Sequence, residues 1–185
     1  MLQHKDNYRN SHMELGKIYF WTATINCWKQ LLLNDDYKQV IINSLQYLSD
    51  KDKINVFAFV IMPNHIHLIW RLNELNGKEL PHASFLKYTG HLFKRKLQLE
   101  NPDFLSAFSV NASNKLFEFW QRDSLAIPLY SKPVALQKLN YLHENPLSKQ
   151  WNLTKYPWKY FYSSASFYQN HDRTFPFLMN LWKEF

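Results

Sequence analysis

The sequence predicts an α+β fold, in which helices pack against one face of an antiparallel sheet. Short segments that alternate apolar and polar residues are interspersed with longer segments whose apolar residues recur at helical spacing. The chain has 185 residues, of which 46% are hydrophobic, and this suffices for one domain whose core needs no disulfide bond. Three glycines, with no visible repeat or low-complexity tract, argue against a solenoid or a long linker.

The first two predicted elements are a strand and a helix. Residues 17–25 alternate and are rich in aromatic and β-branched side chains, as strands are. Residues 37–48 carry apolar side chains at helical spacing, and Asp35 or Asp36 can cap this helix while their charge suits its N-terminal dipole.

A pair of strands follows. Residues 55–61 and 65–72 are both apolar and β-branched, and the three residues between them, Met62-Pro63-Asn64, are typical of a turn. We therefore predict that the two segments pair with each other and that the second strand begins at His65.

The second half of the chain predicts a helix, a strand and another helix. Residues 83–100 have one apolar and one basic face, and residues 116–122 suggest the fourth strand. Residues 131–145 predict the last long helix, which ends before Pro146 because a residue that precedes proline avoids the helical conformation. The aromatic segment 151–185 is expected to wrap the domain with short helical pieces.

This order is that of a ferredoxin-like split βαβ sheet with one appended C-terminal helix. We predict a single domain over residues 1–185, with a polar N-terminal tail over residues 1–16 and an aromatic C-terminal extension over residues 151–185. Because the helices of such a sheet lie on one face, the other face would be free to carry a site.

The charge and the aromatic content favour a nucleic-acid partner. Lys and Arg number 22 against 15 acidic residues, which gives a net charge of +7 and raises the local concentration of phosphate groups. Aromatic residues make up 17% of the chain, and unpaired bases stack on exposed rings. The alternative, that most of these rings form the core, remains open for each of them.

The sequence also bears on the cellular compartment. Cys27 is the only cysteine, so no disulfide can form within the chain, and we expect this side chain to pack in the core. No apolar signal segment begins the sequence, and no apolar run approaches the roughly 20 residues of a membrane span. We therefore expect a cytoplasmic protein that does not enter the membrane.

Two histidines near the start of a predicted strand are candidate metal ligands. Successive side chains of a strand alternate between faces, so His65 and His67 would point the same way, roughly 6 to 7 Å apart. Two imidazoles in this arrangement can share one cation, although a pair of hydrogen-bonded histidines at a sheet edge is the simpler alternative. A third ligand would favour the metal.

Tyr141 and Asn145 of the last long helix are candidates to join them. They are separated by four residues and so share one helix face, about 6 Å apart, while Leu142 turns toward the core. A hydroxyl and an amide oxygen would then project together. By itself this spacing is common in helices that have no site.

The motifs MPNHIHLIW, FWQRD and YLHENP occur in this order along the chain. Their sequences and separations resemble those of the single-tyrosine HUH transposases, and most of all the REP-associated tyrosine transposase branch. The resemblance extends from about residue 17 to residue 168. Each motif alone would be a weak indication, and the combination of three is specific.

The resemblance implies a role for each of the candidate residues. In that family the two histidines bind a divalent metal, Mg²⁺ or Mn²⁺, and this role falls to His65 and His67. The tyrosine of the C-terminal helix is the nucleophile, which corresponds to Tyr141. A polar residue four positions later completes the metal site; many relatives have Gln there, whereas this chain has the shorter Asn145. His143 or Glu144 could replace it if the helix were rotated.

The resemblance further implies DNA as the partner, single-stranded, hairpin or repeat-associated. The relatives include dimers that exchange the tyrosine helix, so a homodimer and a monomer both remain open. We expect the basic face of the helix over 83–100 to contact phosphates, and the FWQRD element to lie close to the site. The predicted DNA-binding residues are Lys87, Lys94, Arg95, Trp120, Gln121 and Arg122.

The leading hypothesis is therefore a metal-dependent nicking and strand-transfer enzyme that forms a covalent 5′-phosphotyrosine intermediate. Because that linkage retains the bond energy, strand rejoining would need no ATP. The first alternative is a non-catalytic module that binds single-stranded nucleic acid on the same fold. The second is a metal hydrolase of small phosphoesters, for which no additional acidic ligands are apparent.

Overall fold

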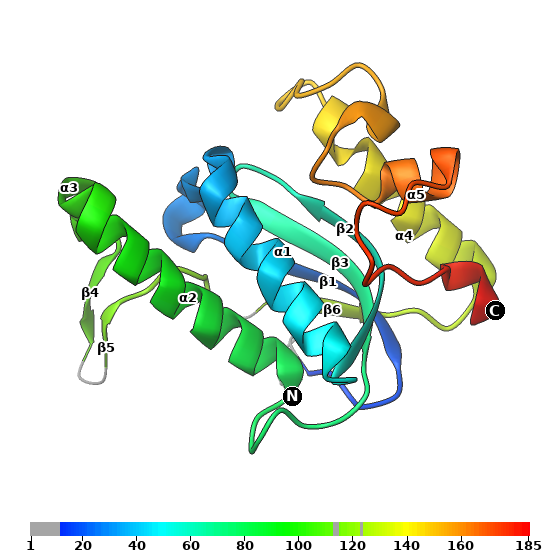
Figure 1. Ribbon diagram of the computed structural model, residues 1–185, viewed down its shortest axis with the longest axis horizontal. Helices are drawn as coiled ribbons and strands as arrows, with labels where there is room; N and C mark the ends of the chain where they lie inside the picture. The colour runs from blue at the N-terminus through cyan, green and yellow to red at the C-terminus, as the bar shows by residue number, and fades with distance from the viewer. Residues whose placement is uncertain (1–11, 113–114, 123) are drawn as a thin grey trace, which may run out of the picture.

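A four-stranded antiparallel sheet lies at the centre of the protein (Figure 1). The computed structural model describes residues 12–112, 115–122 and 124–185, so most of the predicted N-terminal tail lies outside the described residues. The strands are ordered β2 (Ile54–Ile61), β3 (His65–Leu72), β1 (Ile18–Thr24) and β6 (Leu125–Pro128), and all neighbours are antiparallel. This is the order of a split βαβ sheet, as predicted.

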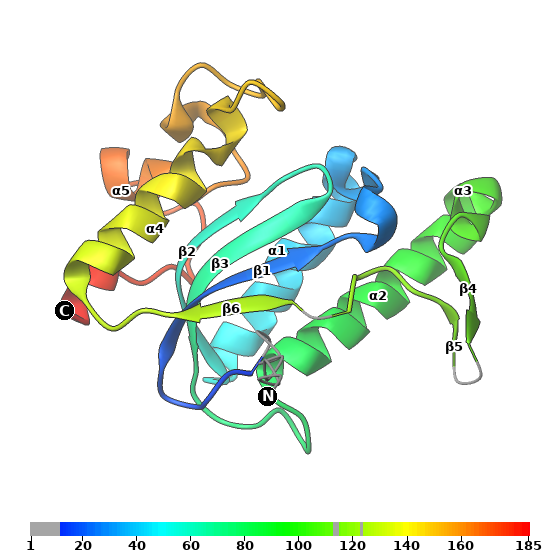
Figure 2. The same ribbon diagram turned by 180° about the vertical axis from the view of Figure 1, so that it is seen from behind.

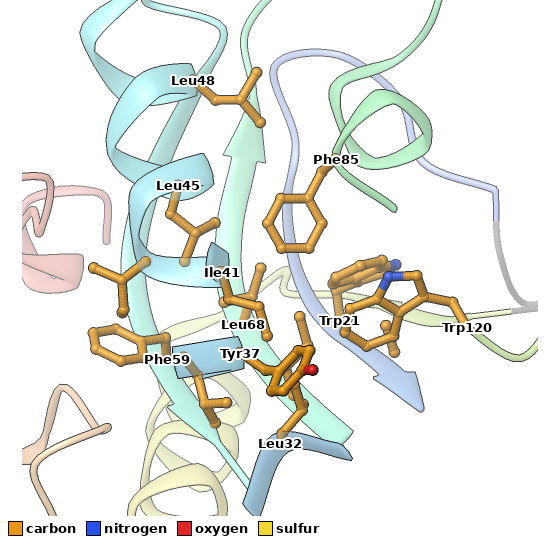
Figure 3. Close-up of a cluster of buried hydrophobic side chains, with 14 of the residues drawn as sticks. Trp21, Leu32, Tyr37, Ile41, Leu45, Leu48, Phe59, Leu68, Phe85 and Trp120 are labelled. Carbon is orange, nitrogen blue, oxygen red and sulfur yellow. The ribbon is translucent and has the colours of Figure 1, made fainter. Parts of the chain in front are cut away.

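Two long helices cover one face of this sheet, α1 (Asp35–Asp50) and α2 (Pro81–Glu100). Figure 3 shows the core between them and the sheet, in which Ile41 and Leu45 of α1 and Phe85 of α2 approach the strand residues Trp21 and Leu68. All five side chains are almost completely buried, which makes this layer the largest hydrophobic contribution to the fold.

The N-cap of α1 differs from the prediction. Asn34, and neither Asp35 nor Asp36, caps the helix, because its side-chain Oδ1 accepts a hydrogen bond of 2.9 Å from the backbone N–H of Asp36. The two aspartates occupy the first turn instead, where their negative charge is favourable beside the helix N-terminus.

The appended helix α4 (Lys132–Glu144) lies on the opposite face of the sheet from α1 and α2. Ala135, Leu139 and Leu142 form its buried stripe and pack in a second cluster with strand residues such as Phe20 and Ile69. Figure 2 shows the sheet from this side, with α1 and α2 behind it. The second face is thus only partly free, because α4 covers the end of the sheet formed by β2 and β3.

The predicted fourth strand over residues 116–122 is wrong. β4 (Ser109–Ala112) and β5 (Lys115–Phe117) form a separate two-stranded hairpin, and β6 takes the edge position of the main sheet instead. Phe119 and Trp120 are adjacent and both buried against α2, so this segment does not alternate between two faces as a strand would.

The remaining elements are short. Within the described ranges no helix is long and apolar enough to cross a membrane. Cys27 is exposed, so the prediction that it packs in the core is wrong. The C-terminal segment does contain the expected short helical pieces. The short helices are α3 (Pro102–Ser106) and α5 (Ala165–Asn170), with 3₁₀ turns at Asn26–Trp28, Leu31–Leu33, Asn145–Leu147, Pro157–Lys159 and Leu181–Lys183.

Strand alternation decides which side chains face α4. On β3, Ile66 and Leu68 enter the core beneath α1 and α2, while His65, His67 and Ile69 lie on the other face. The two histidines therefore lie on the same side of the sheet as the last long helix.

Candidate active site

Asn64 fixes the orientation and the protonated nitrogen of His65. The amide Nδ2 of Asn64 donates to the backbone carbonyl of Trp28 at 3.2 Å, so its Oδ1 is the acceptor that lies 2.7 Å from the Nδ1 of His65. The proton of a neutral His65 must then be on Nδ1, and Nε2 keeps its lone pair.

Thr22 and Asn145 fix His67 in the same way. Thr22 lies directly opposite His67 in the sheet, and its Oγ1 is 2.7 Å from the Nδ1 of His67. The Nδ2 of Asn145, which can only donate, lies 3.2 Å from the Nε2 of His67. Nε2 is therefore the acceptor and Nδ1 carries the proton, so Nε2 is unprotonated in both histidines.

Burial keeps both imidazoles neutral at physiological pH. It lowers the pKa of His65 to about 4, and the amide of Asn145 offsets part of that effect. It lowers the pKa of His67 to about 3, helped by the positive charge of Lys138 and, once protonated, by that of His65. A neutral imidazole with an unprotonated Nε2 is the form that binds a metal ion, so the two histidines need not lose a proton to do so.

Tyr141 lies beside His67 on the exposed face of α4. Its ring centroid is 5.4 Å from that of His67 and 5.9 Å from that of Phe20, and the side chain is 51% exposed. Lys138, one turn earlier, places its Nζ 6.0 Å from the centre of the Tyr141 ring. Residues 138, 141 and 145 lie on one helix face because they are separated by three and four positions.

These side chains line a single cavity of about 1120 Å³. Its floor is formed by β1, β3 and β6, one wall is α4, and the rest comes from Trp28 and from the segment over residues 147–157. The side chains that β1, β3 and the α4 segment contribute are Phe20, Thr22, Thr24, His65, His67, Lys138, Tyr141, Glu144 and Asn145. The structure thus brings together the histidine pair, the tyrosine and the asparagine that the sequence motifs single out.

The donors in this cavity are suited to a hard divalent ion. In the part of the chain that the structure describes, no three His, Cys, Asp or Glu side chains are grouped closely enough to hold a metal. Two imidazoles and one amide converge instead, and rotation of the Asn145 amide by half a turn would present its oxygen beside them. With water completing the shell, this set fits Mg²⁺ or Mn²⁺.

The two alternative third ligands have different positions. His143 points away from the cavity, and its Nε2 lies 2.9 Å from the Oγ of Ser164. Glu144 does line the cavity. Of the two, only Glu144 remains a possible ligand beside Asn145.

The predicted DNA-binding residues lie elsewhere. Lys87, Lys94 and Arg122 line a second cavity of about 670 Å³ between α2 and the β4–β5 hairpin. Lys87 pairs with Glu79 at 3.0 Å, and Arg122 pairs with Glu118 at 3.2 Å. None of these three residues lines the cavity that contains the histidine pair.

The FWQRD element is largely structural. The ring of Trp120 is buried at 7% exposure and its Nε1 donates to the Oγ1 of Thr89 at 2.9 Å, so it is a core side chain that cannot stack on a base. The backbone N–H of Gln121 donates to the carbonyl of Thr24 at 2.8 Å and extends the edge of β1. Arg95, which lies outside this element and is the last of the predicted DNA-binding residues, is exposed on α2.

Sequence reasoning missed several residues of the site. Lys138 could have been found, because it lies one turn before Tyr141 on the same helix face. Asn64 lies within the histidine motif, where the sequence indicates only a turn. Thr22 and Trp28 gave no local signal, since their proximity to the histidines follows from strand pairing and loop geometry.

The fold and the site define the protein as a ferredoxin-like α+β domain with a histidine pair on a central strand and a polar helix face across from it. No family model and no curated protein matches the chain. Among solved structures it is similar to a REP-associated tyrosine transposase bound to a REP hairpin, with 17% identity and a TM-score of 0.58. The match covers 95% of this chain and 88% of that one, and it confirms the predicted fold.

Proposed function

We propose that the protein is a transposase-like enzyme that nicks DNA and transfers the strand through a covalent link to Tyr141. One observation carries this proposal: Tyr141, Asn145 and the paired histidines, which come from distant parts of the chain, line one cavity. The similar structure was solved with a REP hairpin, which supports DNA as the partner here too. The net charge of +7 is consistent with a phosphate-rich ligand.

In the proposed reaction the hydroxyl oxygen of Tyr141 attacks a backbone phosphorus atom. A phosphorus–oxygen bond to Tyr141 forms, the bond to the 3′ oxygen breaks, the phenol gives up its proton and the 3′ oxygen gains one. The products are a 5′-phosphotyrosine and a free 3′-hydroxyl. The reverse attack by a 3′-hydroxyl rejoins a strand without another energy source.

The chain's own residues divide this task between binding and orientation. His65, His67 and Asn145 would hold the divalent ion, which would neutralise charge on the phosphate and orient it for in-line attack. Thr22 and Asn64 keep the two Nε2 lone pairs directed into the cavity. The ammonium group of Lys138, 6.0 Å from the centre of the Tyr141 ring, would contact the anionic phosphate.

The substitution Tyr141→Phe tests this proposal. The wild-type protein should form a denaturant-resistant adduct with a labelled DNA hairpin that carries a single-stranded flank, in the presence of Mn²⁺. Tyr141→Phe should abolish the adduct and leave noncovalent binding within about twofold, because the ring is retained and little binding area is lost. Tyr130→Phe is the matched control, since Tyr130 is 80% exposed and does not line the cavity.

An adduct that persists in Tyr141→Phe would place the nucleophile elsewhere, and Tyr156, which also lines the cavity, would be examined next. A wild-type protein that shifts the DNA but never cleaves it would support the alternative of a binding module. Turnover of a small phosphodiester by Tyr141→Phe would support the hydrolase.

A further inference from the structure

Trp28 is a large aromatic side chain that the fold leaves in water at the edge of the active-site cavity. It is 61% exposed although it lies only three residues after the buried Ile25, at the end of the 3₁₀ turn Asn26–Trp28. It lines the same cavity as His65 and Tyr141. An indole in such a position has a flat apolar face available for a ligand.

The backbone that carries this indole is strained. Cys27 has φ 55° and Trp28 has φ 57°, so two consecutive residues other than glycine adopt the left-handed conformation. Each such residue costs roughly 1 kcal/mol or more, and the arrangement persists only where surrounding contacts enforce it. The enforcing contacts are the hydrogen bond from Trp28 N–H to the Ile25 carbonyl at 2.9 Å and the one from Asn64 Nδ2 to the Trp28 carbonyl at 3.2 Å.

The same Asn64 side chain also orients His65. Its Nδ2 binds Trp28 while its Oδ1 lies 2.7 Å from the Nδ1 of His65. One buried amide therefore sets both the strained turn below the indole and the imidazole that faces the cavity. The indole therefore has a defined position relative to the candidate metal site. A tryptophan that was exposed for an unrelated reason would not need such a fixed position.

The chemistry around Trp28 suits a nucleic-acid strand. Trp151 and Tyr156 line the cavity from a different segment, and Lys138 and Lys155 add positive charge to the same walls. Aromatic faces interleaved with ammonium groups match the alternation of bases and phosphates along a single strand.

We infer that Trp28 is a stacking platform for an unpaired nucleobase that lies next to the phosphate bound in the cavity. The inference rests on the proposed function in one respect, that the ligand is single-stranded nucleic acid. It adds a residue, outside the histidine and tyrosine motifs, that would position the strand. Stacking of this kind would tolerate any base and would set which phosphate reaches Tyr141.

A double-mutant cycle between protein and DNA tests this inference without any chemistry. All measurements use the Tyr141→Phe protein and a hairpin oligonucleotide whose single-stranded flank carries an abasic position, moved one nucleotide at a time. Because base–aromatic stacking is worth about 1–3 kcal/mol per base, one abasic position should weaken binding by roughly 5- to 150-fold. Trp28→Ala should weaken binding of the intact strand by the same factor. In that variant, removal of the base at the same position should cause no further loss of affinity.

Two control variants separate stacking from other effects. Trp28→Phe should restore part of the affinity, because the smaller ring still stacks. Tyr47→Ala should retain full affinity and the full abasic effect, since Tyr47 is 58% exposed but lies on α1, on the opposite face of the sheet. Thermal unfolding of each variant verifies that the fold is intact.

The inference fails if the abasic penalty is the same with and without the indole. It also fails if Trp28→Ala changes the mass of the protein in solution and leaves DNA binding unaltered, because the side chain would then serve a protein contact. Nicking by the wild-type protein with no Trp28 effect would leave the proposed function intact. A Trp28-dependent abasic effect without nicking would overturn the function alone, and a protein that binds no DNA would overturn both.

Discussion

Thr22→Val should weaken metal binding without disturbing the fold of the sheet. Valine has nearly the same shape as threonine and favours strands equally well, so the substitution removes one hydroxyl and little else. That hydroxyl lies 2.7 Å from the Nδ1 of His67, whose side chain is only 5% exposed. Without it the buried Nδ1–H has no partner on the β1 side.

Loss of this hydroxyl should lower both the free energy of unfolding and the metal affinity. A buried donor left unsatisfied costs about 1–3 kcal/mol, so the free energy of unfolding should fall by that amount. The neutral imidazole can also relocate its proton to Nε2, and a protonated Nε2 cannot bind a metal ion. Loss of such an outer hydrogen bond typically lowers metal affinity 10- to 100-fold.

Titration of Mn²⁺ into the wild-type and variant proteins by calorimetry measures the affinity, and urea unfolding measures the stability. Thr24→Val is the matched control, because Thr24 lies two residues further along β1, opposite His65, and also lines the cavity. The orientation of His65 depends on Asn64 instead, so this control should bind Mn²⁺ as the wild type does. Equal affinities for wild type and Thr22→Val, or equal losses in both variants, would refute the role assigned to Thr22.

Two further predictions concern pH and subunit exchange. Burial lowers the pKa of His143 to about 4, as it lowers those of His65 and His67 to about 4 and 3, so the unfolded chain binds protons that the folded chain does not. The free energy of unfolding of the metal-free protein should be highest above pH 6.5 and should fall as the pH drops toward 4, by up to about 3 kcal/mol per histidine. A urea midpoint that does not change between pH 7 and pH 4.5 would contradict this. Because Tyr141 lies beside the histidines of its own chain, a mixture of His67→Ala and Tyr141→Phe proteins should form no DNA adduct, and recovery of the adduct on mixing would instead show that the helix acts across a dimer.

Much of the secondary structure could be predicted because it depends on local periodicity. β3 begins at His65 and ends at Leu72 as expected, since the turn residues before it and the alternation within it are properties of a short segment. The helix over residues 132–144 likewise follows from Pro133 near its start and its stripe of apolar side chains. The fourth strand was misplaced, because the aromatic residues Phe119 and Trp120 favour a strand by type while α2 buries both of them together.

The sequence by itself determined the strand, the helix and the face of each on which the histidines, Tyr141 and Asn145 lie, because those properties repeat over two to four residues. Only the tertiary structure decided which residues meet. Thr22 reaches His67 across 45 residues of sequence, and Asn145 reaches it across 78, through strand pairing and the packing of α4. The position of Trp28, too, depends on one amide from a neighbouring turn, and no local pattern encodes such a contact.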